Sequence, residues 1–155
     1  MRRGPVSPES GGATARQGGV PLGKHAPEGP FLLVRGAWRW ENGPDLVLRA
    51  LAPLCREGRL RVVFLGQGPQ EDELRYLVDF LGLGEQVWVV TTELGREGQA
   101  PEWAAEARAV LDIAGALAQG WRLIRDGVLV ANIPFADGDR LKRASLSLEE
   151  ERGSA

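Results

Sequence analysis

Two glycine-containing turns are the places in this sequence where the residue types suit chemistry. The first covers residues 35–43 and the second covers residues 66–69, Gly-Gln-Gly-Pro; each turn follows an apolar run and precedes a helical pattern. Turns at this position aim backbone N–H groups and the positive end of a helix dipole at a ligand, which favours phosphate. The two turns are therefore candidate phosphate sites, and simple tight turns between strand and helix are the alternative.

The second turn does not complete a dinucleotide-binding motif. After Gly66 and Gly68, the third glycine of that motif would fall at Glu71. Pro69 removes a backbone donor, and the acidic residues at the start of the following helix repel phosphate. The sequence therefore argues against a nicotinamide cofactor.

Two tryptophans, Trp38 and Trp40, flank Arg39 in the first turn. Aromatic rings beside a cation can stack on a base or a sugar. Tryptophan is equally at home in a core, where the two rings would cover the end of a sheet. The sequence leaves both interpretations open.

The remaining reactive side chains are few. One cysteine, Cys55, and one histidine, His25, cannot supply an intrachain disulfide, a histidine-based metal site or a supported catalytic triad. We expect no metal, and we expect Cys55 to be a core thiol. Asp112 stands between apolar residues and either faces solvent or points into a site.

These turns require a sheet to position them. Apolar runs at residues 31–34, 60–65 and 86–90 predict strands buried on both faces, as in a parallel sheet. Helices are predicted from residue 44, with Pro53 kinking or ending the first, and over residues 71–81. Alternating strands and helices imply parallel βαβ units.

The second half of the chain is predicted to contain a long helix, a strand and a last helix. Helical spacing of apolar residues covers residues 101–121 and places Trp103 and Trp121 on one core-facing side. A fourth strand is expected over residues 127–133 and a final helix over 139–148.

Together these elements predict an open, mainly parallel, Rossmann-like α/β sheet of about four strands, flanked by helices. With 155 residues, a single domain is expected, over residues 30–148. Residues 1–30 hold seven glycines and five prolines, so residues 1–29 are predicted to be a disordered or linker-like tail. Residues 149–155 are predicted to fray.

Charge and hydropathy exclude some function classes. The formal net charge is −2, from 19 Lys and Arg against 21 Asp and Glu, which argues against a nucleic-acid partner held by charge. No run of 18 apolar residues exists, so no transmembrane segment is expected. The basic start lacks the apolar core of a signal peptide, which indicates a cytoplasmic protein.

A series of short motifs resembles the C-terminal, donor-binding domain of family 4 (group 1) glycosyltransferases of the GT-B fold. The motifs occur in the family's order, at residues 31–36, 41–51, 60–69, 81–87, 123–130 and 137–144. The resemblance implies transfer of a hexose from a UDP- or GDP-sugar, with no other cofactor. It also implies an acceptor bound by a separate domain or subunit, because this chain matches a truncated and diverged donor half.

The same resemblance implies donor contacts at six positions: Gly36, Arg39, Asn42, Gly66, Gly68 and Asp112. The family's arginine and lysine fall at Ala37 and Asn42, so both charges are missing, and Arg35 or Arg39 would have to substitute. Asp112 matches the second of the family's two glutamates, and the partner position is Ala104.

The expected function is therefore the donor-binding half of a nucleotide-sugar-dependent glycosyltransferase that is not active alone. The alternative is a non-catalytic, degenerate α/β module that binds a partner protein, with tryptophans as anchors. A different small nucleotide-binding domain is a third interpretation, weakened by the incomplete glycine motif.

Overall fold

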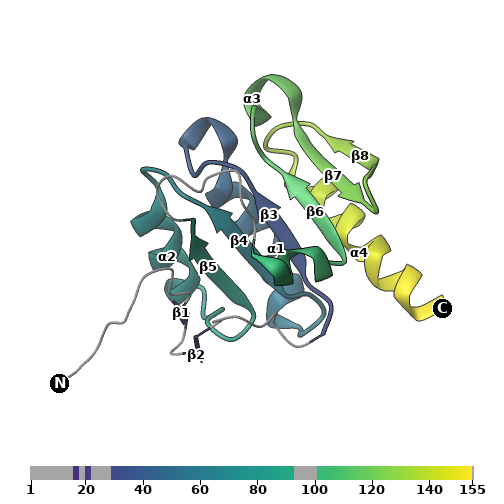
Figure 1. The fold of residues 1–155 in the computed structure, drawn as a ribbon, viewed down its shortest axis with the longest axis horizontal. Helices are drawn as coiled ribbons and strands as arrows, with labels where there is room; N and C mark the ends of the chain where they lie inside the picture. Colours follow the sequence, from purple (N-terminus) through teal and green to yellow (C-terminus); the bar gives the residue numbers. More distant parts are fainter. Residues whose placement is uncertain (1–15, 18–19, 22–28, 93–100, 155) are drawn as a thin grey trace.

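Six strands form one sheet in the computed structural model, which describes residues 16–17, 20–21, 29–92 and 101–154 (Figure 1). In the order in which they lie side by side, they are β5 (Val87–Thr91), β4 (Val62–Gly66), β3 (Leu32–Arg35), β6 (Ala109–Asp112), β7 (Trp121–Arg125) and β8 (Val128–Ile133). β3, β4, β5 and β6 run parallel to one another. β7 pairs antiparallel with β6, and β8 pairs antiparallel with β7. The prediction of an open, mainly parallel α/β sheet in one domain is confirmed, but the expected count of about four strands is too low.

The order of the strands reverses at β3. The chain builds β3, β4 and β5 outward in one direction and then returns to place β6 on the free side of β3. In open α/β sheets, such a reversal leaves a crevice at the carboxyl ends of the two strands that flank it. Here those ends are Arg35 of β3 and Asp112 of β6, which lie opposite each other in the register.

The two faces of the sheet are covered unequally. One face packs against the apolar sides of α1 (Pro44–Arg56), α2 (Glu71–Phe80) and α4 (Gly138–Ser154) and forms the larger core. The other face packs against the short 3-10 helix η2 (Glu102–Glu106) through Trp103, whose ring meets Phe31 edge-on at 6.1 Å between centroids. Because both faces are buried, the central strands are continuous apolar runs, as the sequence indicates.

The first three predicted strands and the first two predicted helices are confirmed to within two residues at most ends. Pro53 does not end the first helix, because α1 continues through it to Arg56. The buried side chains of Leu54 and Cys55 hold this last turn against the core, which compensates for the missing proline N–H. Cys55 is a core thiol, as expected, and burial raises its pKa from 9.0 to about 12.

The predicted helix over residues 101–121 is wrong. That stretch forms η2, β6, the short helix α3 (Ala116–Gln119) and the start of β7. Gly115 and Gly120 both have positive φ, 71° and 79°, which ends any continuous helix there. Trp103 and Trp121 are buried as predicted, but they belong to the cores on opposite faces of the sheet.

β7 and β8 form a hairpin closed by a two-residue turn. Asp126 and Gly127 both adopt positive φ, 53° and 77°, the backbone of the turn type that matches strand twist. The strand predicted over residues 127–133 is therefore present as β8, but it lies antiparallel at the edge of the sheet (Figure 1).

Near both ends of the chain, the structure contains elements outside the predicted bounds. α4 runs to Ser154, six residues past its predicted end at Leu148, since no strong helix breaker intervenes before Gly153. Within the predicted tail, β1 (Arg16–Gln17) and β2 (Val20–Pro21) pair as a small antiparallel ladder. The rest of residues 1–28, including His25, lies outside the described residues, as do residues 93–100. No helix in the described part of the chain is both long and apolar enough to cross a membrane.

Candidate functional site

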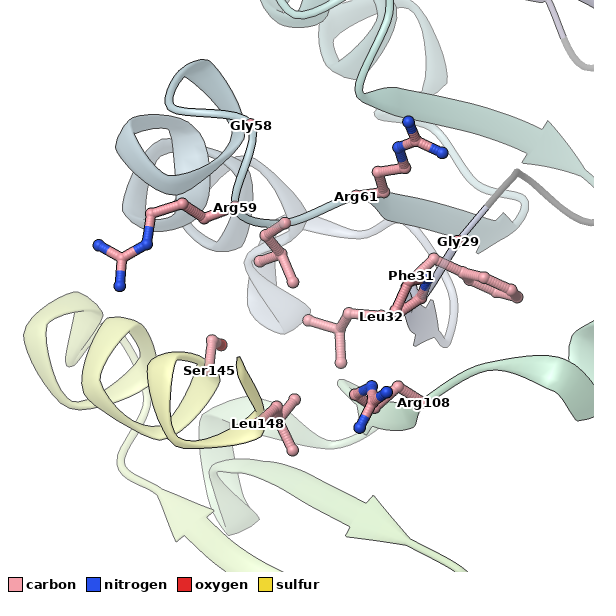
Figure 2. A pocket seen from close by; sticks show the side chains of 11 residues that line it. Gly29, Phe31, Leu32, Gly58, Arg59, Arg61, Arg108, Ser145 and Leu148 are labelled. Atoms are coloured by element: carbon pink, nitrogen blue, oxygen red, sulfur yellow. The ribbon is translucent and has the colours of Figure 1, made fainter. Parts of the chain in front are cut away.

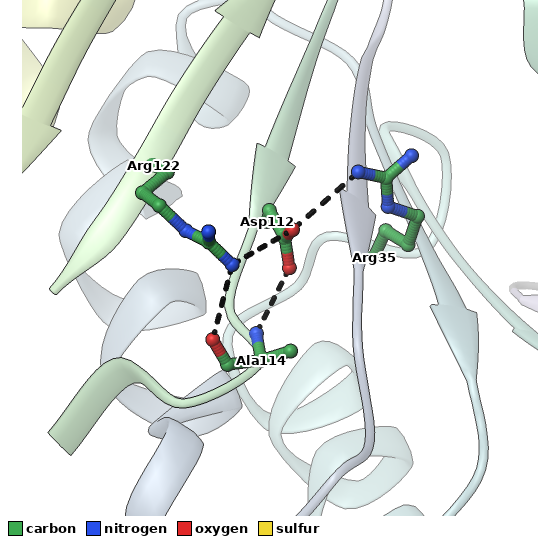
Figure 3. A network of polar contacts seen from close by, with 4 residues as sticks. All are labelled: Arg35, Asp112, Ala114 and Arg122. Atoms are coloured by element: carbon green, nitrogen blue, oxygen red, sulfur yellow. Dashed lines mark hydrogen bonds and ion pairs between the residues drawn. The ribbon is translucent and has the colours of Figure 1, made fainter. Parts of the chain in front are cut away.

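Three charged side chains meet where the strand order reverses. Arg35 at the end of β3, Asp112 at the end of β6 and Arg122 near the start of β7 occupy facing positions on three neighbouring strands. Figure 3 shows the two guanidinium groups approaching the Asp112 carboxylate from opposite sides. The sheet register therefore assembles a charged cluster at the crevice where ligands bind in folds of this type.

The carboxylate of Asp112 organises this cluster. Its Oδ2 accepts hydrogen bonds from Arg122 Nη2 at 3.0 Å and from Arg35 Nη2 at 3.4 Å. Its Oδ1 accepts from the backbone N–H of Ala114 at 3.0 Å, and Arg122 Nη2 also donates to the Ala114 carbonyl oxygen at 3.4 Å. Two guanidinium groups share one carboxylate, so the cluster carries an excess of one positive charge.

The two arginines differ in how open they are to solvent. The Arg35 side chain is 53% exposed and that of Arg122 is 33% exposed, whereas the Asp112 side chain is only 16% exposed. Arg122 is therefore fixed more firmly by its shorter bond and its second acceptor, and Arg35 is the freer of the two cations. An incoming anion would meet Arg35 first.

Glycines allow the three turns at this edge to approach one another. A Cβ on Gly36, whose φ is 138°, would stand 2.8 Å from Ile113 Cγ1 and 2.9 Å from the Ala114 nitrogen. A Cβ on Gly66 would stand 2.5 Å from the Gly36 carbonyl oxygen, and one on Gly68 would stand 2.6 Å from the Trp38 oxygen. Backbone packing thus accounts for all three glycines, as the tight-turn interpretation predicts.

The two tryptophans of the first turn have different environments. Trp38 is fully buried, and its backbone pairs with the second turn through Trp38 N–H to Gln67 O (2.9 Å) and Gln70 N–H to Trp38 O (3.0 Å). Trp40 is 67% exposed. The core interpretation is therefore correct for Trp38, whereas the Trp40 side chain is open to solvent.

Arg39 engages its own turn. Its Nε donates to Glu41 Oε2 at 3.3 Å, and both side chains are open to solvent. The pKa of Glu41 is lowered, chiefly by a hydrogen bond from its own backbone N–H; desolvation opposes this, and the hydrogen bond and charge of Arg39 add smaller lowering effects. The structure shows no ion pair between Arg39 and Asp112 within the described residues.

Asn42 is buried and its amide closes the first turn. Its Nδ2 donates to the Ala37 carbonyl oxygen at 2.8 Å, and its backbone carbonyl oxygen accepts from Trp121 Nε1 at 2.9 Å. The residue therefore ties the 3-10 helix η1 (Trp40–Asn42) to β7. The resemblance places a cation at position 42, but the Asn42 side chain instead forms a hydrogen bond within its own turn.

Sequence reasoning missed Arg122 altogether, because a helix was predicted up to residue 121 and no strand was expected before residue 127. The available signal was the Asp126-Gly127 pair between two apolar segments, which predicts a hairpin and therefore a strand at residues 121–125. Among the residues that the structure describes, no group of three His, Cys, Asp or Glu side chains could hold a metal ion.

Part of the chain matches a known protein family. Residues 23–93, just under half of the chain, match the family model described as "Glycosyl transferases group 1". The matched span includes β3, β4, β5 and both glycine turns, so the resemblance seen in the sequence is confirmed there. Asp112 and Arg122 lie beyond this span. No curated protein matches the sequence.

Proposed function

We propose that this chain, similar to group 1 glycosyltransferases over residues 23–93, is the donor-binding half of a nucleotide-sugar-dependent glycosyltransferase. The family match supports glycosyl transfer in general. The observation that carries the finer proposal is the Arg35–Asp112–Arg122 cluster at the reversal of strand order. It lies beside both glycine turns and holds more positive than negative charge.

The chemistry required is mainly electrostatic. A sugar leaves a nucleotide donor when the bond to the diphosphate breaks, and the departing diphosphate must be stabilised as an anion. Arg35 is exposed enough to turn from Asp112 to a phosphate, and guanidinium groups bind phosphate oxygens in a bidentate manner. Arg122 stays with Asp112 and the Ala114 carbonyl and keeps the end of β6 in place.

The turns around the cluster suit a bulky anion. Ala37, which follows Gly36 in the first turn, carries only a methyl group. Trp40, with its exposed ring, offers a surface on which a base or a sugar could stack. In this proposal Arg35 replaces the missing cation at Ala37.

We further propose that the chain acts with a separate acceptor-binding domain or subunit in the cytoplasm. The cations that the family carries at positions 37 and 42 are absent, so Arg35 must bear most of the phosphate charge. A single exposed arginine gives weaker stabilisation of a diphosphate than two or three aligned cations. This supports a domain that binds donor and depends on its partner for transfer.

One observation favours a second candidate, a non-catalytic module that binds a partner protein. The Asn42 amide is already bonded within the turn, and two large apolar side chains, Trp40 and Leu117, are exposed on η1 and α3, which contact each other. Exposed tryptophans are common anchors of protein interfaces. In that case the charged cluster would stabilise the sheet and bind no nucleotide.

A calorimetric titration separates the two candidates. The purified chain is titrated with UDP, GDP, UDP-glucose and GDP-mannose, and then with NADH to test for a different nucleotide site. The donor proposal predicts saturable binding of a nucleoside diphosphate that weakens at least tenfold in Arg35→Gln.

The matched control is Arg49→Gln, which removes an exposed arginine from the middle of α1. It should leave nucleotide binding unchanged. Absence of any nucleotide binding by a folded chain would contradict the donor proposal and support the partner-binding module. Binding of NADH with no response to nucleotide sugars would contradict both.

A further inference from the structure

The opposite edge of the sheet contains a cavity that the proposed donor site does not use. Its volume is about 340 Å³, and it lies at the amino ends of β3, β4 and β6, next to α4 (Figure 2). The volume is at the lower end of the range of about 300–1,000 Å³ usual for sites that bind small molecules. Apolar side chains, chiefly Leu32, Leu60 and Leu148, form much of its wall.

Two polar atoms at this cavity are buried without a partner. Ser145, which is 2% exposed, has no hydrogen-bond partner for its Oγ within the described part of the chain, and the same is true of Arg108 Nε. Figure 2 shows Ser145 and Arg108 on two sides of the space between α4 and the start of β3. Buried polar groups are almost always satisfied, so two orphans at one cavity indicate a missing partner.

Two arginines at the cavity, Arg61 and Arg108, form no ion pair with the side chains that the structure describes. Among the described side chains, which do not include those of residues 149–155, no carboxylate lies within 4.0 Å of Arg61 or Arg108. Arg59, at the rim, is already paired with Glu57 at 3.4 Å and is not required. A guanidinium and a hydroxyl beside apolar walls form the donor set that an oxyanion needs.

We propose that this cavity is a second binding site, for a small oxyanion with a short aliphatic body. The anionic head would accept hydrogen bonds from Arg108 and from the Ser145 hydroxyl, and Arg61 would add charge at the rim. The aliphatic part would lie against Leu32 and Leu148. A carboxylate and a phosphate monoester share this chemistry.

The proposal is tested by calorimetric titration of the full 155-residue chain with hexanoate, hexyl phosphate and hexanol. We expect saturable binding of hexanoate or hexyl phosphate, at least tenfold tighter than binding of hexanol. The relative affinity of the two anions identifies the preferred head group. Equal binding of hexanol, or binding of none of the three, would overturn the proposal.

Two variants and their controls locate the binding. Arg108→Gln should weaken anion binding at least tenfold, and Ser145→Ala should weaken it several-fold while keeping the fold, since alanine fits the same space. Arg49→Gln and Ser147→Ala are the matched controls, because Ser147 is exposed and already bonded to the Ala144 carbonyl. Unchanged affinity in both Arg108→Gln and Ser145→Ala, with circular dichroism showing a folded chain, would place the anion elsewhere and overturn the proposal.

This test is independent of the donor proposal. UDP titrated into Ser145→Ala should bind as it does to the unchanged chain, and hexanoate should bind Arg35→Gln normally. Loss of hexanoate binding in Arg35→Gln would contradict the assignment of two separate sites.

Discussion

Arginines lie at both the carboxyl and the amino ends of the parallel strands, here called the carboxyl edge and the amino edge, but the two sets differ in their ion pairs. At the carboxyl edge, Arg35 and Arg122 share the carboxylate of Asp112, so any anion must compete with a bonded partner. At the amino edge, among the described side chains (those of residues 149–155 are not among them), no carboxylate lies within 4.0 Å of Arg61 or Arg108 and no partner bonds the Ser145 hydroxyl. The difference shows that the presence of an arginine says little about binding until its counter-charge is known.

The packing of the two edges differs as well. The carboxyl edge is closed by backbone contacts at Gly36, Gly66 and Gly68, where no Cβ fits. The amino edge instead encloses open volume. Buried polar atoms without a described partner occur at both edges, Arg122 Nε at the first and Ser145 Oγ at the second, so the difference between the edges is the open volume.

The largest effect is expected from adding a side chain at the carboxyl edge. Gly36→Val should lower the free energy of unfolding by about 3 kcal/mol or more, because it combines a positive φ with atoms 2.8 and 2.9 Å away. Urea denaturation measures the change. The control is Gly58→Ala, which has positive φ but nothing within 4 Å and should cost about 1 kcal/mol. Equal losses in the two variants would show that the close packing at Gly36 is unimportant.

The next effect distinguishes the two arginines of the cluster. Arg122→Gln should lower the free energy of unfolding by about 1–2 kcal/mol, because it removes the shorter bond to a largely buried carboxylate. Arg35→Gln removes a longer, more exposed bond and should cost about 0.5 kcal/mol or less. Thermal and urea unfolding of both variants check the order, and the reverse order would contradict the description of Arg35 as the freer cation.

The competition at the carboxyl edge can be removed. Asp112→Asn keeps an oxygen for the Ala114 N–H but loses the charge that holds both guanidinium groups. If Arg35 serves a phosphate, UDP or GDP should bind roughly tenfold more tightly to this variant, as expected for loss of a nearby opposing charge. Calorimetry at low and high salt measures the gain. A decrease in affinity would mean that Asp112 itself contacts the ligand.

The smallest expected effect is a change in the free energy of unfolding at the amino edge. Ser145→Ala removes an unbonded buried hydroxyl, so the chain without ligand should gain about 1 kcal/mol in the free energy of unfolding. Ser147→Ala, on the same helix, should show no gain because its hydroxyl is exposed and bonded. Thermal unfolding without added anions compares the two. A loss of stability in Ser145→Ala would show that its hydroxyl is satisfied.

The sequence predicts the first half of the fold well for a physical reason. β3, β4 and β5 are buried on both faces, so each is a continuous apolar run, and α1 and α2 carry proline or acidic residues at their starts. The second half is different. β6 has only four residues, and its apolar neighbours happen to fall at helical spacing, so local pattern could not reveal a strand held by pairing with β3.

The residues of the charged cluster also differ in whether the sequence identifies them. Gly36 and Asp112 were identified from the sequence, and register alone brings the ends of their strands together. Arg122 was missed because its strand was missed. Trp38 is buried and Trp40 is exposed because Trp38 packs against the second turn. The local sequence pattern does not show which of the two tryptophans makes that contact.

The most direct test of the central proposal is to locate nucleotide binding on the sheet by NMR. A ¹⁵N-labelled chain is titrated with UDP and GDP, and backbone amide shifts are followed together with the arginine Nε resonances. We predict saturable changes at Gly36, Ala114 and the Arg35 side chain, with none at Ser145. Absence of any change, or changes confined to the amino edge, would contradict the assignment of the Arg35–Asp112–Arg122 cluster as the donor site.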